Sequence, residues 1–455
     1  MILSILSGLA IWLGFAPFEF WPGPYLGLFL LYQVLQRDSL ISRVGFSFIA
    51  GLTFFGPLLH WSGSYVGALP WILLTVLQSL IFSSIGILRL SPWSFAALFT
   101  IIEIVRMKFP FGGFGWGRVG FTQIEPLHHI YPIIGITGIT FLISLLAGLL
   151  NRINLRQSFG FTIILLLPLI NSNIAYSSSI RVAAIQGGVD SLGLDFNSRA
   201  MSVFNRHINE TKALNVPVDL IVWPENSADI DPEKNVIAAK SLRELAAQIK
   251  TPILVGAVSQ GAKGPENNSI LYNSDGEIQS KYQKQDLAPF GEYIPLRSIA
   301  QAVAPEAKRV RDFQPGRTWV FHEIAGKKFA SVICFEILDD DLIRTAARKS
   351  DFLVAQTNNA TFGTSPQARQ QLQITRVRAA ELGRDFAVVS TTGYTAKISA
   401  TGSIESSLPQ FESGVLTMEI RTTREATPAS HIPSWLWVGV LGLITLWSQR
   451  SVFTR

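Results

Sequence analysis

The sequence predicts two joined parts: a polytopic α-helical membrane domain of about eight spans, and an α/β domain on the extracytoplasmic side of the membrane. Two observations lead to this fold class. The 455-residue chain is 48% hydrophobic and only 15% charged, whereas a soluble domain has roughly 25% charged residues. The charge is also uneven, because residues 1–172 hold eight Lys and Arg with four Asp and Glu, while residues 173–430 hold 28 of each kind. A single soluble domain is therefore excluded.

Apolar segments divide the predicted membrane domain, residues 1–172, into seven spans, and residues 431–455 add an eighth span with a short tail. Several segments are short for a hydrocarbon core of about 30 Å, the second and seventh above all. The first segment lacks the basic leader and small-residue cleavage site of a signal peptide, and further spans follow it. In chain order the segments are Ile2 to Phe18, Tyr25 to Leu35, Val44 to Leu59, Leu69 to Leu88, Pro92 to Val105, Ile130 to Leu150, Phe159 to Ile170 and Trp435 to Trp447.

Arginine and lysine set the predicted orientation, because positive residues gather on cytoplasmic loops. Assigning alternate loops to opposite sides puts seven positive residues on one side and three on the other. The side with seven is predicted to be cytoplasmic, so both termini lie inside and residues 172–431 lie outside. The seven are Arg37, Arg43, Arg89, Arg152, Arg156, Arg450 and Arg455, and the three are Arg106, Lys108 and Arg118.

Charge and cysteine content exclude several classes of protein. The net charge is +6, but the part rich enough in charge to be soluble is neutral as a whole, so the excess belongs to membrane loops and not to a nucleic-acid surface. The single cysteine, Cys334, cannot form an intrachain disulfide or a Cys-cluster zinc site. We therefore expect no metal, no cofactor and no nucleic-acid partner.

The loop after the fifth span, Lys108 to His129, contains a stretch rich in glycine and aromatic residues, Gly112 to Gly117. This composition is typical of an aromatic belt and a tight re-entrant turn at the membrane surface. An alternative is that Arg118 and its neighbours bind a lipid headgroup. Glu103 and Arg106, one helical turn apart near the end of the fifth span, are predicted to form a local ion pair.

From Arg181 onward, short β-rich runs alternate with helical patterns such as Arg199 to Ala213 and Ser365 to Leu382. This alternation indicates an α/β domain of about 250 residues, long enough for its own core. The predicted strands are Arg181 to Gln186, Asp219 to Trp223, Pro252 to Val258, Ser269 to Asn273, Phe329 to Ile333, Asp351 to Gln356 and Ala387 to Thr391.

Three strand ends carry reactive groups, at the place where α/β sheets usually hold functional side chains. Glu225 follows the strand that ends at Trp223, Lys284 follows Lys281-Tyr282-Gln283, and Cys334 follows the strand that ends at Ile333. Each residue alone is typical of a surface loop or a small buried side chain. Together they suggest catalysis, because a cysteine between a strand and a predicted helix from Leu338 has its thiolate favoured by the helix N-terminus and a nearby cation, while a carboxylate accepts its proton.

The order Glu225, Lys284, Cys334 resembles the Glu-Lys-Cys triad of the nitrilase, or carbon-nitrogen hydrolase, superfamily. With seven spans before this domain and one after it, the chain is similar over essentially its whole length to the membrane-embedded branch of that superfamily, the apolipoprotein N-acyltransferases. The motifs that carry the resemblance are Trp223-Pro224-Glu225, Lys284 with Pro289 to Leu296, Cys334-Phe335-Glu336, Thr357 to Gly363, and Arg376 to Arg384.

The resemblance implies a four-layer αββα domain, residues 173–430, on the outer face of a bacterial plasma membrane. Its implied activity moves a fatty acyl group from a phospholipid to the α-amine of a diacylglyceryl-cysteine on an apolipoprotein, with both lipids held in the bilayer. Cys334 would be the nucleophile that carries the acyl group as a thioester, Glu225 the general base, and Lys284 the group that stabilises the oxyanion. Glu292 and Glu336 would orient Lys284 or position substrate. The residues predicted to contact substrate are Trp223, Phe290, Phe335 and Arg118.

Two alternatives use the same residues differently. A membrane-anchored amidase of the nitrilase type would hydrolyse a small amide with the same triad and with water as the second nucleophile, but it has little need of eight spans. A non-catalytic membrane receptor or scaffold has no need of all three catalytic residue types. The segment Gln301 to Gly316, between the lysine and cysteine motifs, is either a mobile cover over the site or a plain surface loop.

Overall fold

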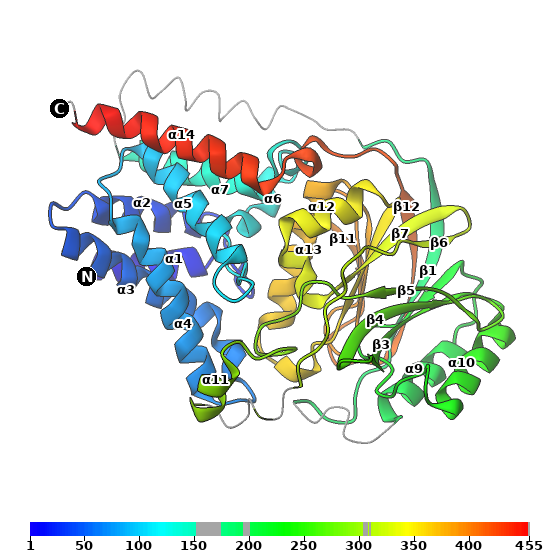
Figure 1. Cartoon of the computed structure of the whole chain (residues 1–455). Coiled ribbons are helices and arrows are strands. Elements are labelled where there is room, and N and C mark those ends of the chain that lie inside the picture. The colour runs from blue at the N-terminus through cyan, green and yellow to red at the C-terminus, as the bar shows by residue number, and fades with distance from the viewer. Residues whose placement is uncertain (152–173, 194–200, 304–307, 309–310, 454–455) are drawn as a thin grey trace. The chain divides into compact units, whose positions relative to one another are not determined.

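A computed structural model describes residues 1–151, 174–193, 201–303, 308 and 311–453 of the chain (Figure 1). The chain forms two compact units, one made of residues 1–173 and 427–455 and the other of residues 174–426. The first unit is helical, and the second contains all of the strands that the described residues form.

Three helices of the first unit are long and apolar enough to cross a membrane: Leu40–Leu58, Ala68–Gly86 and Tyr131–Leu150. Three apolar helices are shorter, and the expected span Phe159 to Ile170 lies outside the described residues. The count of eight spans therefore stays a prediction. The helices of this unit are α1 (Ile2–Trp12), α2 (Gly23–Leu35), α3 (Leu40–Leu58), α4 (Ala68–Ser83), α5 (Pro92–Lys108), α6 (Ile124–Leu127), α7 (Tyr131–Leu150) and α14 (Ser434–Phe453).

Small residues bring the first helices of this unit into close contact. A side chain at Gly8 of α1 would place its Cβ 2.2 Å from the carbonyl oxygen of Ala50 in α3, so glycine is required there. The hydroxyl of Ser7 donates a hydrogen bond of 2.8 Å to the carbonyl of Gly27 in α2. Close backbone approach and hydrogen bonds between helices hold a unit together where water is absent.

The loop after α5 folds back against the helices, and this corrects two predictions. Glu103 accepts hydrogen bonds from Val119 N–H and the Thr140 hydroxyl, and Arg118 lies 4.0 Å from it. The predicted local pair of Glu103 with Arg106 is wrong, because Arg106 donates instead to the backbone carbonyl of Trp116. The loop supplies partners that spacing along one helix does not reveal.

The same loop removes Arg118 from the predicted headgroup and substrate contacts. Its side chain is fully buried and donates to the Thr137 hydroxyl at 3.0 Å. The guanidinium is enclosed among α5, α7 and the loop, where its contacts are to residues of this unit. The prediction failed because an arginine in a loop between spans is usually exposed, whereas here the loop folds back and buries it.

The second unit contains two six-stranded sheets, with strand orders β12-β1-β2-β3-β4-β5 and β11-β10-β9-β8-β7-β6. In each sheet three neighbouring strands are parallel, β1 to β3 and β7 to β9, and the flanking strands are antiparallel. The strands are β1 (Ser178–Gln186), β2 (Leu220–Val222), β3 (Ile253–Gln260), β4 (Pro265–Tyr272), β5 (Ile278–Gln283), β6 (His322–Ile324), β7 (Lys327–Ile333), β8 (Phe352–Thr357), β9 (Phe386–Ser390), β10 (Ala396–Ile398), β11 (Ile404–Ser407) and β12 (Gly414–Thr422).

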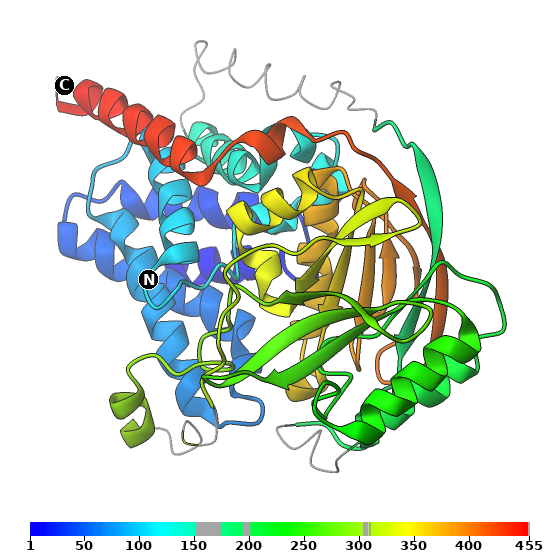
Figure 2. The same cartoon turned by 45° about the vertical axis from the view of Figure 1, so that its right-hand side comes forward.

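Alternating side chains assemble these sheets into four layers. In β1, Val182 and Ala184 face the second sheet, while Ala183 and Ile185 face the helices outside the first. The period of two buries both faces of the strand. Helices α9 (Ser202–Lys212) and α10 (Val236–Ile249) cover the first sheet, and α12 (Asp340–Arg348) and α13 (Gln367–Leu382) cover the second, whereas α11 (Arg297–Val303) joins β5 to β6 (Figures 1 and 2). The expected αββα arrangement is present.

Candidate active site

The three predicted catalytic residues lie at the ends of strands from both sheets. Glu225 follows β2 in the first sheet, Lys284 follows β5 at its edge, and Cys334 follows β7 in the second sheet. Their charges act on one another, since both Glu225 and Lys284 influence the ionisation of Cys334. The double sheet therefore brings together residues that are far apart in the sequence.

Lys284 is a buried cation held between two carboxylates. Its ammonium lies 2.8 Å from Glu292 Oε2 and 3.4 Å from Glu225 Oε1, and its side chain is 1% exposed. Burial by itself lowers the pKa of Lys284, but the charges of Glu292 and Glu225 outweigh it and raise that pKa above the usual range. Lys284 is thus a fixed positive charge beside the cysteine.

Both carboxylate oxygens of Glu225 are hydrogen-bonded. Oε1 accepts from Asn267 Nδ2 at 2.8 Å, and Oε2 accepts from the backbone N–H of Asn358 at 2.9 Å. Burial raises the pKa of Glu225, and Lys284 opposes that rise. A carboxylate with a raised pKa accepts a proton more readily than an ordinary surface glutamate.

Asn267 is a member of the site that the sequence analysis missed. From β4, its Nδ2 donates 2.8 Å hydrogen bonds to both Glu225 and Glu292. A neutral double donor holds two carboxylates apart without cancelling their charge. The available signal was the pair Asn267-Asn268, two buried amides within β4, shortly before its apolar end.

Cys334 occupies a strained turn immediately after β7. Its φ of +51° is left-handed, a conformation that costs a side-chain-bearing residue on the order of 1–3 kcal/mol. The Nε2 of Gln371 in α13 lies 3.7 Å from its sulfur. Burial and the charge of Glu225 raise the pKa of Cys334, whereas Lys284 lowers it. The resting nucleophile is therefore a thiol, and a base must remove its proton.

The α-helix expected from Leu338 is present but begins two residues later than predicted. A short 3-10 helix, Cys334–Leu338, follows the cysteine, and α12 begins only at Asp340. The side chain of Asp339 caps α12 by accepting from the backbone N–H of Leu342. The N-terminal amides of α12 are therefore directed to Asp339 and not to the sulfur.

Glu336 connects the cysteine turn to the strand end that carries Lys284. Its Oε1 accepts from the Tyr282 hydroxyl and from Gln285 N–H, both at 2.7 Å, and its Oε2 accepts from Ile333 N–H at 2.8 Å. Burial raises the pKa of Glu336 to about 7, and these donors hold it down. Of the two glutamates predicted to orient Lys284, Glu292 contacts it directly, whereas Glu336 contacts the backbone N–H of the next residue, Gln285.

The structure places the predicted substrate contacts of this unit differently. Trp223 is a core residue and not a substrate contact: its side chain is fully buried beside Phe204, and its Nε1 donates to the Thr211 hydroxyl at 2.9 Å. Phe290 is 52% exposed in a turn with φ +65°, and Phe335 is half-buried next to Cys334. Of the three substrate contacts predicted in this unit, the two phenylalanines therefore have exposed surface and Trp223 has none.

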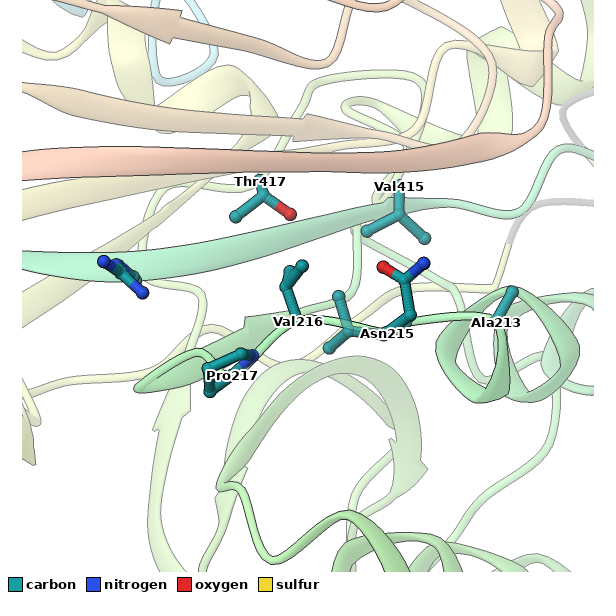
Figure 3. A pocket seen from close by; sticks show the side chains of 8 residues that line it. Ala213, Asn215, Val216, Pro217, Val415 and Thr417 are labelled. Atoms are coloured by element: carbon teal, nitrogen blue, oxygen red, sulfur yellow. The ribbon is translucent and has the colours of Figure 1, made fainter.

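A pocket of about 360 Å³ lies elsewhere in the unit, between β12, β1 and the segment that follows α9 (Figure 3). Its lining contains one ionisable side chain, Arg181, and no cysteine, histidine or carboxylate. In the described ranges, no group of three or more His, Cys, Asp or Glu side chains could hold a metal ion. The catalytic assignment therefore stays with the strand ends. The pocket is lined by Arg181, Ala213, Leu214, Asn215, Val216, Pro217, Val415 and Thr417.

Comparison with known proteins divides the chain at the same place. The family model of the apolipoprotein N-acyltransferase N-terminal domain matches residues 7–149, and the carbon-nitrogen hydrolase model matches residues 181–428. A relative named apolipoprotein N-acyltransferase from Mycolicibacterium smegmatis is 32% identical, over 94% of this chain and 81% of the relative. Relatives of the same name from Haemophilus influenzae and Vibrio cholerae are 29% and 28% identical, over 99% and 96% of this chain and 93% and 95% of their own lengths.

Proposed function

The chain belongs to the apolipoprotein N-acyltransferase family, and from this premise we propose that Glu225, Lys284 and Cys334 transfer a fatty acyl group from a membrane phospholipid to the α-amine of a diacylglyceryl-cysteine. The enzyme is an acyltransferase that acts on lipoproteins. The observation that supports these residues is a lysine enclosed by two carboxylates beside the single cysteine of the chain.

In the first half-reaction, the sulfur of Cys334 attacks the ester carbonyl of the phospholipid while its proton passes to Glu225. A C–S bond forms and the ester C–O bond breaks. The departing alkoxide of the lysophospholipid takes the proton from Glu225. Lys284 faces the negative charge that develops on the carbonyl oxygen, an interaction whose loss typically slows a reaction about 10²- to 10³-fold.

In the second half-reaction, the α-amine of the diacylglyceryl-cysteine attacks the thioester. A C–N bond forms, the C–S bond breaks, and the amine proton passes through Glu225 to the leaving sulfur. The raised pKa of Glu225 suits both halves, because the same group must accept a proton and then return it. The result is an amide on the lipoprotein and a free thiol on the enzyme.

We further propose that residues 172–431 face the outside of the cell and that the membrane unit crosses the bilayer several times. Seven positive residues against three support this orientation. Alkaline phosphatase fused at Ser280 should be active in whole cells, and a reporter that works only in the cytoplasm should be silent there. The reverse pattern would overturn the orientation.

The covalent intermediate gives the direct test of the triad. Purified enzyme incubated with phospholipid alone should gain the mass of one fatty acyl chain, because no acceptor is present to discharge the thioester. Neutral hydroxylamine should remove the added mass, and Cys334→Ala should never acquire it. Intact-protein mass spectrometry makes the measurement.

Two further arms assign the base and the acceptor. Glu225→Gln should form the adduct at least 10²-fold more slowly, because the thiol lacks its proton acceptor, while Glu277→Gln, at an exposed surface glutamate, should match the wild type. A diacylglyceryl-cysteine peptide should discharge the thioester to an N-acylated peptide. Active enzyme without an adduct contradicts the covalent mechanism, and discharge to water alone would favour the amidase alternative.

A further inference from the structure

The sulfur of Cys334 has a neighbour outside the Glu-Lys-Cys triad. Gln371 of α13 is buried, at 4% exposure, and its Nε2 donates toward Sγ over 3.7 Å. This distance is within the longer range of hydrogen bonds to sulfur. Gln371 is therefore a polar group in contact with the reacting atom that the sequence pattern did not reveal.

The orientation of the Gln371 amide is fixed by its other end. Its Oε1 accepts from Asn359 Nδ2 at 3.0 Å and from Gln367 Nε2 at 3.3 Å. Both of these groups are donors, so Oε1 must face them and the NH₂ group must face the sulfur. This set of hydrogen bonds assigns the NH₂ group to the side that faces Cys334.

Asn359 is itself held by residues at the ends of β8 and β9. Its Oδ1 accepts from the Ser390 hydroxyl at 2.6 Å and from the Thr357 hydroxyl at 3.1 Å. The Ser390 hydroxyl in turn accepts from the backbone N–H of Gly393 at 2.8 Å. A single sequence of donors therefore runs from Gly393 through Ser390, Asn359 and Gln371 to the sulfur.

Hydrogen bonds aligned in one direction polarise one another, and a buried environment strengthens them. The positive end of this chain points at Cys334. A thiolate benefits from such a donor much more than a thiol does, because hydrogen bonds to charged groups are the stronger ones. The chain of amides thus favours negative charge on sulfur without adding a formal charge to the site.

We propose that Gln371 is a further catalytic residue, which donates an N–H to the sulfur of Cys334 whenever that sulfur carries negative charge. This inference rests on the proposed function. Negative charge forms on sulfur twice, when the thiol passes its proton to Glu225 and when the C–S bond of the thioester breaks. Lys284 then stabilises the negative charge on the carbonyl oxygen, while Gln371 stabilises the negative charge on the sulfur. Asn359 is a positioning residue that fixes the direction of the Gln371 amide.

Alkylation of the thiol tests this assignment directly. Cys334 is the single cysteine, so the rate of reaction with iodoacetamide as a function of pH reports on that residue alone. Gln371→Met keeps the length of the side chain but removes the donor. We expect its alkylation profile to move about one pH unit upward, so that alkylation below the midpoint is about tenfold slower than in the wild type.

A matched control and a second variant separate chemistry from folding. Gln373→Met makes the same change at an equally buried glutamine two positions along, roughly 200° around the helix, and should leave the profile in place. Asn359→Asp keeps an acceptor for Ser390 but presents a carboxylate to Gln371, so that the amide turns its NH₂ away from the sulfur. Its profile should shift in the same direction as that of Gln371→Met, although almost no volume has changed.

The acyl-enzyme gives the second readout. Gln371→Met should form the phospholipid thioester, and discharge it to a diacylglyceryl-cysteine peptide, about tenfold more slowly in each step. Wild-type profiles and rates in both Gln371→Met and Asn359→Asp would overturn the role of Gln371 while leaving the triad intact. A wild-type enzyme that never forms the thioester would instead refute the proposed function, and the alkylation profiles would still decide the role of Gln371.

Discussion

Two buried clusters of charged side chains in the α/β unit differ in their balance of positive and negative groups. Asp340, Arg344, Arg378 and Glu381, between α12 and α13, form a balanced set in which Arg378 lies 2.7 Å from both Asp340 and Glu381 and Arg344 lies 2.8 Å from Glu381. The catalytic cluster of Glu225, Lys284 and Glu292 has two carboxylates for one cation. The first cluster has as many carboxylates as guanidinium groups. The second has one carboxylate more than its single cation can balance.

This difference in charge balance suits the first cluster to stabilising the fold and the second to exchanging protons. In the balanced cluster, burial opposes the charge of Arg378, but Asp340 and Glu381 outweigh it and raise its pKa, so Arg378 stays charged. In the catalytic cluster, a neutral amide, Asn267, takes the place of a second cation. A second cation would lower the pKa of Glu225 and make it a poor base. The imbalance is thus what allows Glu225 to exchange protons.

Removing the cation of the catalytic cluster should have the largest effect. Lys284→Met should lower the rate of thioester formation by at least 10²- to 10³-fold, because the oxyanion loses its partner and the two carboxylates are left facing each other. Lys284→Arg should fail as well, because a planar guanidinium does not fit a site built around an ammonium. The rate of adduct formation, followed by mass spectrometry, makes the measurement.

Lys281→Met is the matched control, because Lys281 lies on β5, the strand that Lys284 follows, but is 29% exposed in a surface pair with Glu233. It should retain activity. Near-normal turnover by Lys284→Met would show that the cluster around Lys284 is structural, like the one between α12 and α13.

Opening the balanced cluster should affect stability more than chemistry. Arg378→Met leaves Asp340 and Glu381 buried with too little positive charge and removes donors from the carbonyls of Ile337 and Leu338. We expect the free energy of unfolding to fall by about 3–5 kcal/mol. Thermal unfolding in detergent should show the loss, and Arg348→Met, at an exposed residue of α12, should not. A variant as stable as the wild type would mean that this cluster contributes nothing net.

The smallest expected effect is a change in stability with pH, caused by His207, a buried histidine that is not part of either cluster. His207 accepts from Gly187 N–H through Nε2, its Nδ1 contacts the carbonyl of Val203, and burial lowers its pKa to about 4. Its pKa in the unfolded chain is about 6.5, so between these values the unfolded state binds more protons and stability falls as the pH falls. The loss should be at most roughly 3 kcal/mol, complete by about pH 4.

His207→Gln should flatten this part of the stability profile, because glutamine does not titrate. Unfolding temperatures measured from pH 7 to pH 4 make the comparison. An unchanged slope would assign the acid sensitivity to other groups, among which His322, with a pKa lowered by burial to about 3, is the first to examine.

The strands were predictable because their local pattern matches their burial. All seven predicted runs overlap strands of the structure. The runs that end at Trp223, Ile333 and Gln356 lead to Glu225, Cys334 and Asn358, the last of which binds Glu225 through its backbone N–H. β12 escaped prediction because it is defined by pairing with β1, a partner more than two hundred residues earlier. Contacts between distant segments also conceal Asn267 and Gln371, whose roles depend on side chains that only the folded chain brings near.

Trp223 shows an error that the sequence could have prevented. Side chains alternate along β2, with Leu220 and Val222 facing the second sheet and Ile221 and Trp223 facing the helices. A tryptophan in phase with Ile221 belongs to the helix-covered core, whatever residue follows it. In the membrane unit, by contrast, hydropathy located the helices. Among its described residues, three helices reach the length and apolarity of a span, and others are shorter because turns such as the one after Trp12 end them.

The antiparallel pairing of β1 with β12 has a consequence for how such a chain could have been assembled. Ser178, near the start of the α/β unit, lies directly opposite Thr422, near its end. A domain whose two ends meet can be placed within a loop of a host protein without stretching that loop, which is the geometry that domain insertion requires. The chain has this layout, because the helical unit is continued on both sides of the α/β unit and the two junctions lie near residues 174 and 426.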